Sequence, residues 1–282
     1  MLYVSSACLK ANKISDIVKR FAEAGIRNIE LSGGTKYYPE VEKDLVELKE
    51  RCDLSYVFHA YFPPPEVDFV INLASCNDEI YKRSIEHYDK AIEMMKRVGS
   101  QVLSIHAGFL VEIAVGEIGK KLKNRIIYDE AKAYDRFCQA YKNLEKKCME
   151  NGITLYLENN VLNGENYKEF SYHNYMMMTD YQSIMKMKEQ IEFNLLLDLG
   201  HLHVSSKTLE LNYSEECDAV RRWVRWIHLS ENNGIFDEHK PLKEQSEILK
   251  EFYKLDNQGI NITLETVGSM EDILKSINIL NS

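Results

Sequence analysis

The sequence lacks several features that would assign it to a specialised class of protein. No apolar run reaches the roughly 20 residues needed to cross a bilayer. The N-terminus has no basic segment followed by an apolar stretch, so we expect no signal peptide. The six cysteines are scattered and form no CxxC pair, as in proteins that keep reduced thiols. These absences favour a cytoplasmic protein without a membrane span.

The sequence also has fewer basic than acidic residues. The chain has 35 Lys and Arg against 44 Asp and Glu, for a formal net charge of -9. Such a surface has no general attraction for phosphate backbones or anionic lipids. We therefore expect neither nucleic acid nor membrane as a partner.

The chain does contain a regular alternation of two kinds of segment. Its 282 residues are 45% hydrophobic, enough for one large core. Segments of helical periodicity separate eight short apolar runs. Strict alternation predicts parallel strands joined by crossover helices, so we expect a single-domain (β/α)8 TIM barrel over residues 1–282, with a doubly wound open sheet as the alternative. The expected strands are 2–7, 28–32, 54–60, 101–107, 153–159, 193–199, 224–230 and 261–267.

Several helix boundaries are marked by their residue types. Asn77 is typical of a helix N-cap and Gly99 of a C-terminal stop, which predicts a long helix between them. Ser269 and Asp272 have the spacing of a capping box. The least certain helix is a short one at 214–221, after the sixth strand.

Acidic and histidine side chains gather where the predicted strands end. In a barrel of this kind the carboxyl ends of the strands meet at one mouth, where active sites lie. Converging carboxylates and imidazoles would repel or stay unsatisfied without a cation, so we expect a divalent metal: zinc, manganese, iron or cobalt, with one to three ions. The residues are His59, His106, Glu158, Asp198, His201, His228, Asp237, His239 and Glu265.

Each of these residues also has a structural explanation. A single histidine at a strand end is commonly just hydrogen bonded, and Asp198 could cap the turn that follows it. His203 is as consistent with structure as with ligation. Asn159, Asn232 and Lys240, with His201, are candidate substrate contacts, although loop polarity explains the first three equally well. What favours a site is the recurrence of such residues at six consecutive strand ends.

The motifs at these positions resemble the xylose-isomerase-like TIM-barrel superfamily, which contains sugar phosphate isomerases and epimerases and the endonuclease IV type of nuclease. The resemblance implies a metal bound by Glu158, Asp198, His228 and Glu265, with the two glutamates as catalytic acid and base. The motifs are YLEN at 156–159, LLLDLGH at 195–201, WIHLSENNG at 226–234, DEHKP at 237–241 and TLET at 263–266.

The resemblance extends in part to the nuclease branch. His59, His106, His201, Asp237 and His239 stand where that branch has its remaining zinc ligands, so all nine positions of a three-metal site are filled. Two features depart from it. The segment 198–203 reads DLGHLH, and the loop at 32–41 lacks the arginine- and glutamine-rich insert that contacts a DNA duplex.

Three functions remain open on the sequence. We expect first a sugar or sugar-phosphate isomerase or epimerase that moves a proton next to a carbonyl held by the metal. The alternative is an endonuclease IV-like multi-zinc phosphodiesterase, and the third is a non-catalytic metal- and carbohydrate-binding barrel. The expected partner is a small-molecule sugar or sugar phosphate, and a homo-oligomer is possible. Specificity should lie in loops 32–41, 61–70 and 160–178.

Overall fold

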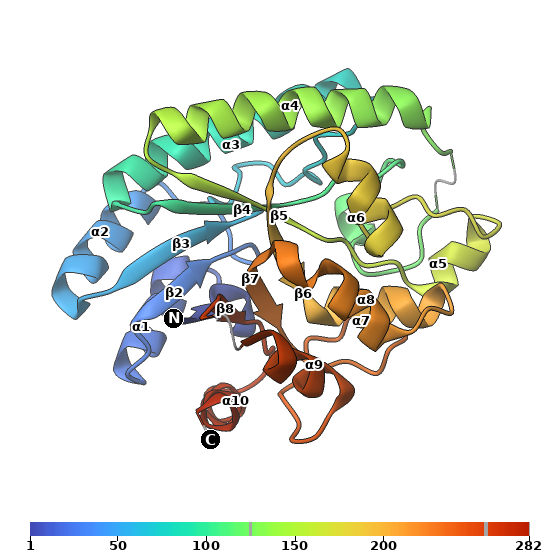
Figure 1. Cartoon of the computed structure of the whole chain (residues 1–282). Helices are drawn as coiled ribbons and strands as arrows, with labels where there is room; N and C mark the ends of the chain where they lie inside the picture. Colours follow the sequence, from blue (N-terminus) through green and yellow to red (C-terminus); the bar gives the residue numbers. More distant parts are fainter. Residues whose placement is uncertain (124–125, 257–258, 282) are drawn as a thin grey trace.

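Eight parallel strands close into a barrel in the computed structural model, which describes residues 1–123, 126–256 and 259–281 (Figure 1). Each strand pairs with the next along the chain, and β1 pairs with β8 to close the ring. The predicted TIM barrel is therefore confirmed, and the open sheet is excluded. The strands are β1 (Leu2–Ser5), β2 (Asn28–Leu31), β3 (Ser55–His59), β4 (Val102–His106), β5 (Thr154–Glu158), β6 (Asn194–Asp198), β7 (Val224–Leu229) and β8 (Asn261–Leu264).

The helices lie outside the ring of strands (Figure 1). One helix follows each of β1 to β4, two follow β5, two follow β6, and one follows each of the last two strands. They are α1 (Ile14–Glu23), α2 (Val41–Cys52), α3 (Asp78–Val98), α4 (Glu130–Glu150), α5 (Gly164–Glu169), α6 (Tyr181–Lys188), α7 (Leu199–Thr208), α8 (Tyr213–Val220), α9 (Glu247–Asp256) and α10 (Met270–Leu280).

Helix α7 is an element that the sequence did not predict. It begins directly after β6, so the predicted strand 193–199 is too long, and the helix expected at 214–221 is α8. Residues 199–206 are buried on every side, so the segment has no polar face. Without amphipathic periodicity, a buried helix cannot be distinguished by its pattern from a continuing strand.

The predicted helix caps are confirmed. The Asn77 side chain accepts a hydrogen bond from the Glu79 amide at the start of α3, and Gly99 ends that helix with a left-handed φ of 65°. Ser269 and Asp272 form the expected capping box at α10. Of the described helices, none is both long and apolar enough to span a bilayer.

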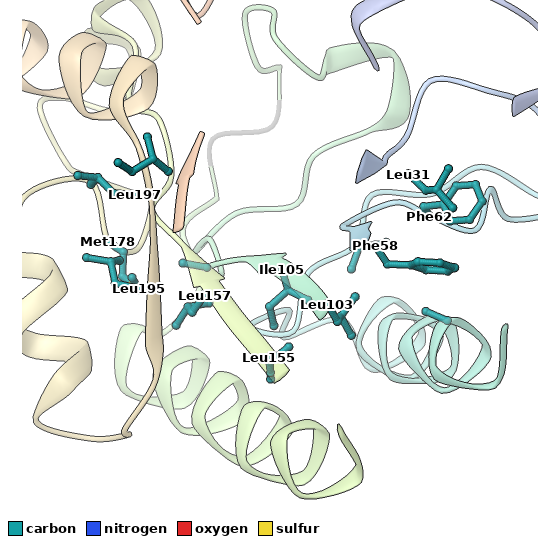
Figure 2. Packing of buried hydrophobic residues seen from close by; sticks show 14 of the residues in the cluster. Leu31, Phe58, Phe62, Leu103, Ile105, Leu155, Leu157, Met178, Leu195 and Leu197 are labelled. Atoms are coloured by element: carbon teal, nitrogen blue, oxygen red, sulfur yellow. The ribbon is translucent and has the colours of Figure 1, made fainter. Parts of the chain in front are cut away.

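Side chains of the strands point alternately outward and inward. Leu195 and Leu197 of β6 belong to the main core between strands and helices (Figure 2), whereas Leu196 points into the barrel. Inside the barrel Leu196 packs in a separate apolar cluster with Tyr3, Val57 and Trp226. Because the period of a strand is two, the residue two positions beyond each of these interior side chains also faces inward, one layer closer to the carboxyl ends.

Candidate metal centre and cavity

The alternation of the strands brings all nine predicted ligands to one mouth of the barrel. His59 follows Val57 by two positions, Asp198 follows Leu196, and His228 follows Trp226. Neighbouring strands are in a register that pairs Asp198 with His228 and His106 with Glu158. The apolar cluster therefore lies inside the barrel directly beneath the layer of polar residues.

Four of these residues form the deepest group. One ligand atom each from Glu158, Asp198, His228 and Glu265 lies within 4.8 Å of all the others, and the four side chains are buried. Nδ1 of His228 lies 3.3 Å from Glu158 Oε1 and 3.4 Å from Glu265 Oε2. Hence the two glutamates, from strands three apart in the ring, face the same nitrogen.

Two further groups of possible ligands adjoin the first. His59 Nε2 and His106 Nδ1 lie 3.4 Å and 3.6 Å from Glu158 Oε2, so Glu158 is shared between two groups. Asp237 Oδ2 lies 3.2 Å from His201 Nε2 and 2.9 Å from His239 Nε2. The described residues thus offer three adjacent sets of nitrogen and oxygen donors, and a fourth set, made by Glu30, His59 and His228, overlaps with them.

The carboxylates and imidazoles shift one another's pKa values strongly. Burial alone would raise the pKa of Glu158, but the imidazoles of His106, His228 and His59 hold it well below its usual range. Burial raises the pKa of Asp198 to about 7, against the opposing effect of His201. Burial opposes ionisation of His239 too, yet Asp237 raises its pKa to about 9. In the absence of a cation, bound protons therefore balance the charge of the cluster.

Whether a divalent metal fits this cluster can be judged from its unpaired polar atoms. Several buried atoms of the cluster have no hydrogen-bond partner. They are both carboxylate oxygens of Glu158, Asp198 Oδ2, His228 Nδ1 and Asp237 Oδ1. Buried polar atoms are rarely left unpaired, and these are all atoms that ligate divalent ions. A mixed set of imidazole and carboxylate donors suits zinc, manganese, iron or cobalt. The residues present therefore fit a divalent metal.

Outer hydrogen bonds orient His228 with its Nδ1 lone pair toward the four-ligand group. The Trp226 indole can only donate, and its Nε1 lies 2.9 Å from Thr263 Oγ1. The Thr263 hydroxyl therefore donates to Glu30 Oε2 at 3.0 Å, and the same oxygen accepts from His228 Nε2 at 3.0 Å. With the proton on Nε2, the lone pair lies on Nδ1.

Two other histidines are oriented by the same principle. The carbonyl of Asn159 can only accept, so His201 carries a proton on Nδ1, 2.9 Å away, and its Nε2 faces Asp237. His59 donates through Nδ1 to Ser104 Oγ at 2.9 Å, because the Ser104 hydroxyl donates to the Phe58 carbonyl. Carboxylate or carbonyl partners of this kind are typical of metal-ligating histidines.

Glu30 is the functional residue that the sequence analysis missed. It is buried at the end of β2, within the run NIELS, and its register partner Ser5 is the inward residue of β1. The signal was an acid two positions after an inward-facing residue, as on the later strands. The polar strand ends predicted from the sequence begin at the third strand, so Glu30 on the second was not among them.

Replacing Glu30 with glutamine is expected to weaken zinc binding by about 10–100-fold, the range for a lost outer partner of a ligand. Glutamine keeps the size but removes the charge that supports the basicity of His228, so affinity should recover in part in Glu30→Asp. The measurement is zinc titration against a competing chelator. Glu251→Gln is the matched control, since Glu251 is a buried glutamate paired with Lys254 on α9. Unchanged affinity in Glu30→Gln would show that Glu30 does not act through His228.

Three of the predicted substrate contacts, Asn159, Asn232 and Lys240, are engaged in contacts within the protein. The Asn159 side chain is fully buried and pairs with both the amide and the carbonyl of Asp198. Asn232 bonds to Gly200 and to His203, which also bonds to Glu247 on α9. Lys240 forms an ion pair with Glu238.

Asp198 combines the two roles considered for it. One oxygen, Oδ1, accepts a hydrogen bond from the His201 amide and caps α7, and the other is unpartnered. Asp198 therefore caps α7 with one oxygen and keeps the other available as a metal ligand.

A cavity of about 480 Å³ opens above the ligand groups. Its floor contains His59, His106, His201, Asp237, His239 and Glu265. Its walls come mainly from the loops after β3, β4 and β5, with Ser32 and Gly33 from the predicted loop 32–41. The loop after β4 was not among the specificity loops predicted. Of the predicted substrate contacts, His201 lines the cavity, whereas Asn159, Asn232 and Lys240 are not among the described residues that do.

This fold, with imidazole and carboxylate donors clustered at one mouth of the barrel, is that of one family of TIM barrels. The chain belongs to the xylose isomerase-like TIM barrel family, whose sequence profile matches residues 18–282. It is 23% identical to an uncharacterized protein of Methanocaldococcus jannaschii, MJ1311, over 98% of this chain and 87% of that protein.

Solved structures show the same fold. A D-tagatose 3-epimerase-like protein is 22% identical with a TM-score of 0.74, over 99% of this chain and 95% of that chain. Endonuclease IV from Thermus thermophilus is 13% identical with a TM-score of 0.61, over 99% and 97%. At these identities the likeness concerns the fold, and it spans both branches that the motifs resemble.

Proposed function

We propose that the protein is a divalent-metal-dependent isomerase or epimerase of a sugar or sugar phosphate. The observation that carries this proposal is the four-ligand group, in which Glu158 Oε1 and Glu265 Oε2 lie 3.3 Å and 3.4 Å from the same nitrogen of His228. Glu265 of this group lines the cavity, whose volume of about 480 Å³ is that of a small-molecule pocket. The similarity to the D-tagatose 3-epimerase-like structure supports the same choice.

The chemistry assigned to the chain is proton transfer next to a carbonyl. A divalent ion held by the four-ligand group would polarise that carbonyl and lower the barrier to proton loss at the adjacent carbon. Glu158 and Glu265 would then serve one face of the substrate each: the ionised glutamate removes a proton, and the other, in its protonated form, donates one. Histidines near Glu265 hold its pKa at about 2 against the effect of burial, so it starts as a base. His201, on the cavity floor, would bind a substrate oxygen.

A second function, hydrolysis of a phosphate ester, is favoured by the two additional ligand groups. A second or third ion bound by the histidine-rich groups would suit the activation of water for attack on phosphorus. The acidic chain and the loop 32–41, in which Lys36 is the sole basic residue, argue against duplex DNA as the substrate.

Incubation with deuterated water separates these functions. We expect the wild-type protein, loaded with zinc, manganese or cobalt, to incorporate deuterium into at least one member of a panel of ketoses and ketose phosphates. Bis(p-nitrophenyl) phosphate and a duplex with one abasic site are tested in parallel. Hydrolysis without any exchange would replace the proposal by the phosphodiesterase, and neither activity would favour a binding protein.

A further inference from the structure

Away from the possible metal ligands, apolar side chains line much of the cavity, together with a few polar residues. Its floor is formed by histidines and carboxylates, whereas its walls are largely aliphatic and aromatic. The wall residues come mainly from the loops after β3, β4 and β5. They include Val70, Ile71, Phe109, Ile113, Leu122 and Met176.

The carboxamides in these walls are engaged within the protein. Nδ2 of Asn160 donates to the carbonyls of Ala107, Gly108 and Met177. Asn72 accepts from the amides of Ala74 and Phe109 and donates to the Phe109 carbonyl. These hydrogen bonds hold the loops together and engage the Nδ2 groups of both side chains within the protein.

A third asparagine in the wall is used in the same way. Oδ1 of Asn166 accepts from the Leu122 amide, and Nδ2 donates to the Lys120 carbonyl. A free sugar would need hydrogen bonds for each hydroxyl that it buries, because an unpaired buried hydroxyl is costly. These walls are poorly suited to a ligand that carries hydroxyls at every carbon.

The apolar lining continues from the floor to the mouth of the cavity. Near the floor, the Tyr61 ring lies 6.4 Å from the His106 ring. At the rim, Ile118 and Phe236 also line the cavity, although 52% and 43% of their surfaces are exposed. Exposed apolar side chains at a binding cleft commonly mark a ligand or partner site.

We infer that the natural substrate is a conjugate, with a polar head that bears two neighbouring oxygens and an apolar aryl or alkyl body. The head reaches the ligand groups on the floor, and the body packs against the walls. The inference rests on the proposed function only for its metal and its oxygen-bearing head. It makes the preferred substrate a substituted sugar or ketone rather than a free hexose.

The apolar subsite can be tested with two hydroxamates, even though the substrate itself is not identified. Acetohydroxamate and benzohydroxamate have the same two chelating oxygens and differ in an apolar body. On the zinc-loaded protein, with metal content measured first, we expect benzohydroxamate to bind at least about tenfold more tightly by calorimetry, since burying a phenyl group is worth that much or more. Ile113→Asn and Ile118→Asn should each reduce this ratio several-fold and leave acetohydroxamate binding unchanged.

Val115→Asn is the matched control. Val115 is 44% exposed in the same loop and is not among the described residues that line the cavity, so its variant should keep the wild-type ratio. Equal affinities for the two hydroxamates on the metal-loaded protein would contradict the apolar subsite while leaving the proposed metal chemistry intact. A protein that takes up no metal would contradict the proposed function and this inference together.

Discussion

Replacing Asp198 with asparagine is expected to lower zinc affinity by at least about 100-fold, more than the loss of an outer partner would. Asp198 contributes an unpartnered oxygen to the four-ligand group, and asparagine removes its charge. Exchange activity should fall with metal content. Asparagine keeps the oxygen that caps α7, so the thermal midpoint of the metal-free protein should stay close to that of the wild type. The stabilisation by added zinc should shrink.

Asp180→Asn is the control for Asp198→Asn. Asp180 is a buried N-cap residue of α6, so the substitution makes the same chemical change at a helix cap outside the ligand groups. Unlike Asp198, Asp180 also accepts hydrogen bonds through its second oxygen, from the hydroxyls of Thr179 and Ser183, so Asp180→Asn should lose some stability without changing metal content. Full metal content and activity in Asp198→Asn, measured by elemental analysis and deuterium exchange, would remove Asp198 from the site.

Glutamine at position 158 or 265 is expected to slow the interconversion of substrate epimers by about 10²–10⁴-fold, as for a lost general acid or base. The two residues end strands three apart in the ring, so each should serve one face of the substrate. A variant with one remaining base can still remove and return a proton on that face. Each variant should therefore exchange deuterium with one epimer only, and the preferred epimer should differ between the two.

The test uses whichever ketose or ketose phosphate the wild type exchanges. Glu158 belongs to two ligand groups, so Glu158→Gln should lose more metal than Glu265→Gln, and rates are compared per bound metal. Glu251→Gln is again the buried control and should keep both exchange and interconversion. If both active-site variants exchanged the same epimer, a single base would serve both faces, and the two-sided arrangement would be wrong.

The barrel and the possible ligands at the strand ends were predictable because both follow from short periods in the sequence, whereas His201, Asp237 and His239 lie beyond the strands. Alternating strands and helices specify parallel strands, and the period of two specifies which end residues share the interior. Asp198 and His228 come together through the register of β6 and β7 alone, although α7 and α8 separate them along the chain.

Other features depend on tertiary contacts that no local pattern encodes. Helix α7 is buried all round and so lacks an amphipathic signature. The carboxamide of Asn159 pairs with the backbone of Asp198 across 39 residues, whereas a polar residue after a strand is equally compatible with a substrate contact. The apolar character of the cavity arises from three loops that meet only in the folded chain.

The metal centre is tested most directly by elemental analysis of the wild-type protein, purified without chelators and dialysed against metal-free buffer. We predict between one and three tightly held divalent ions per chain, with anomalous scattering from a crystal placing the first among Glu158, Asp198, His228 and Glu265. A protein that remains free of divalent metal after incubation with zinc, manganese, iron and cobalt would contradict the metal centre and the function built on it.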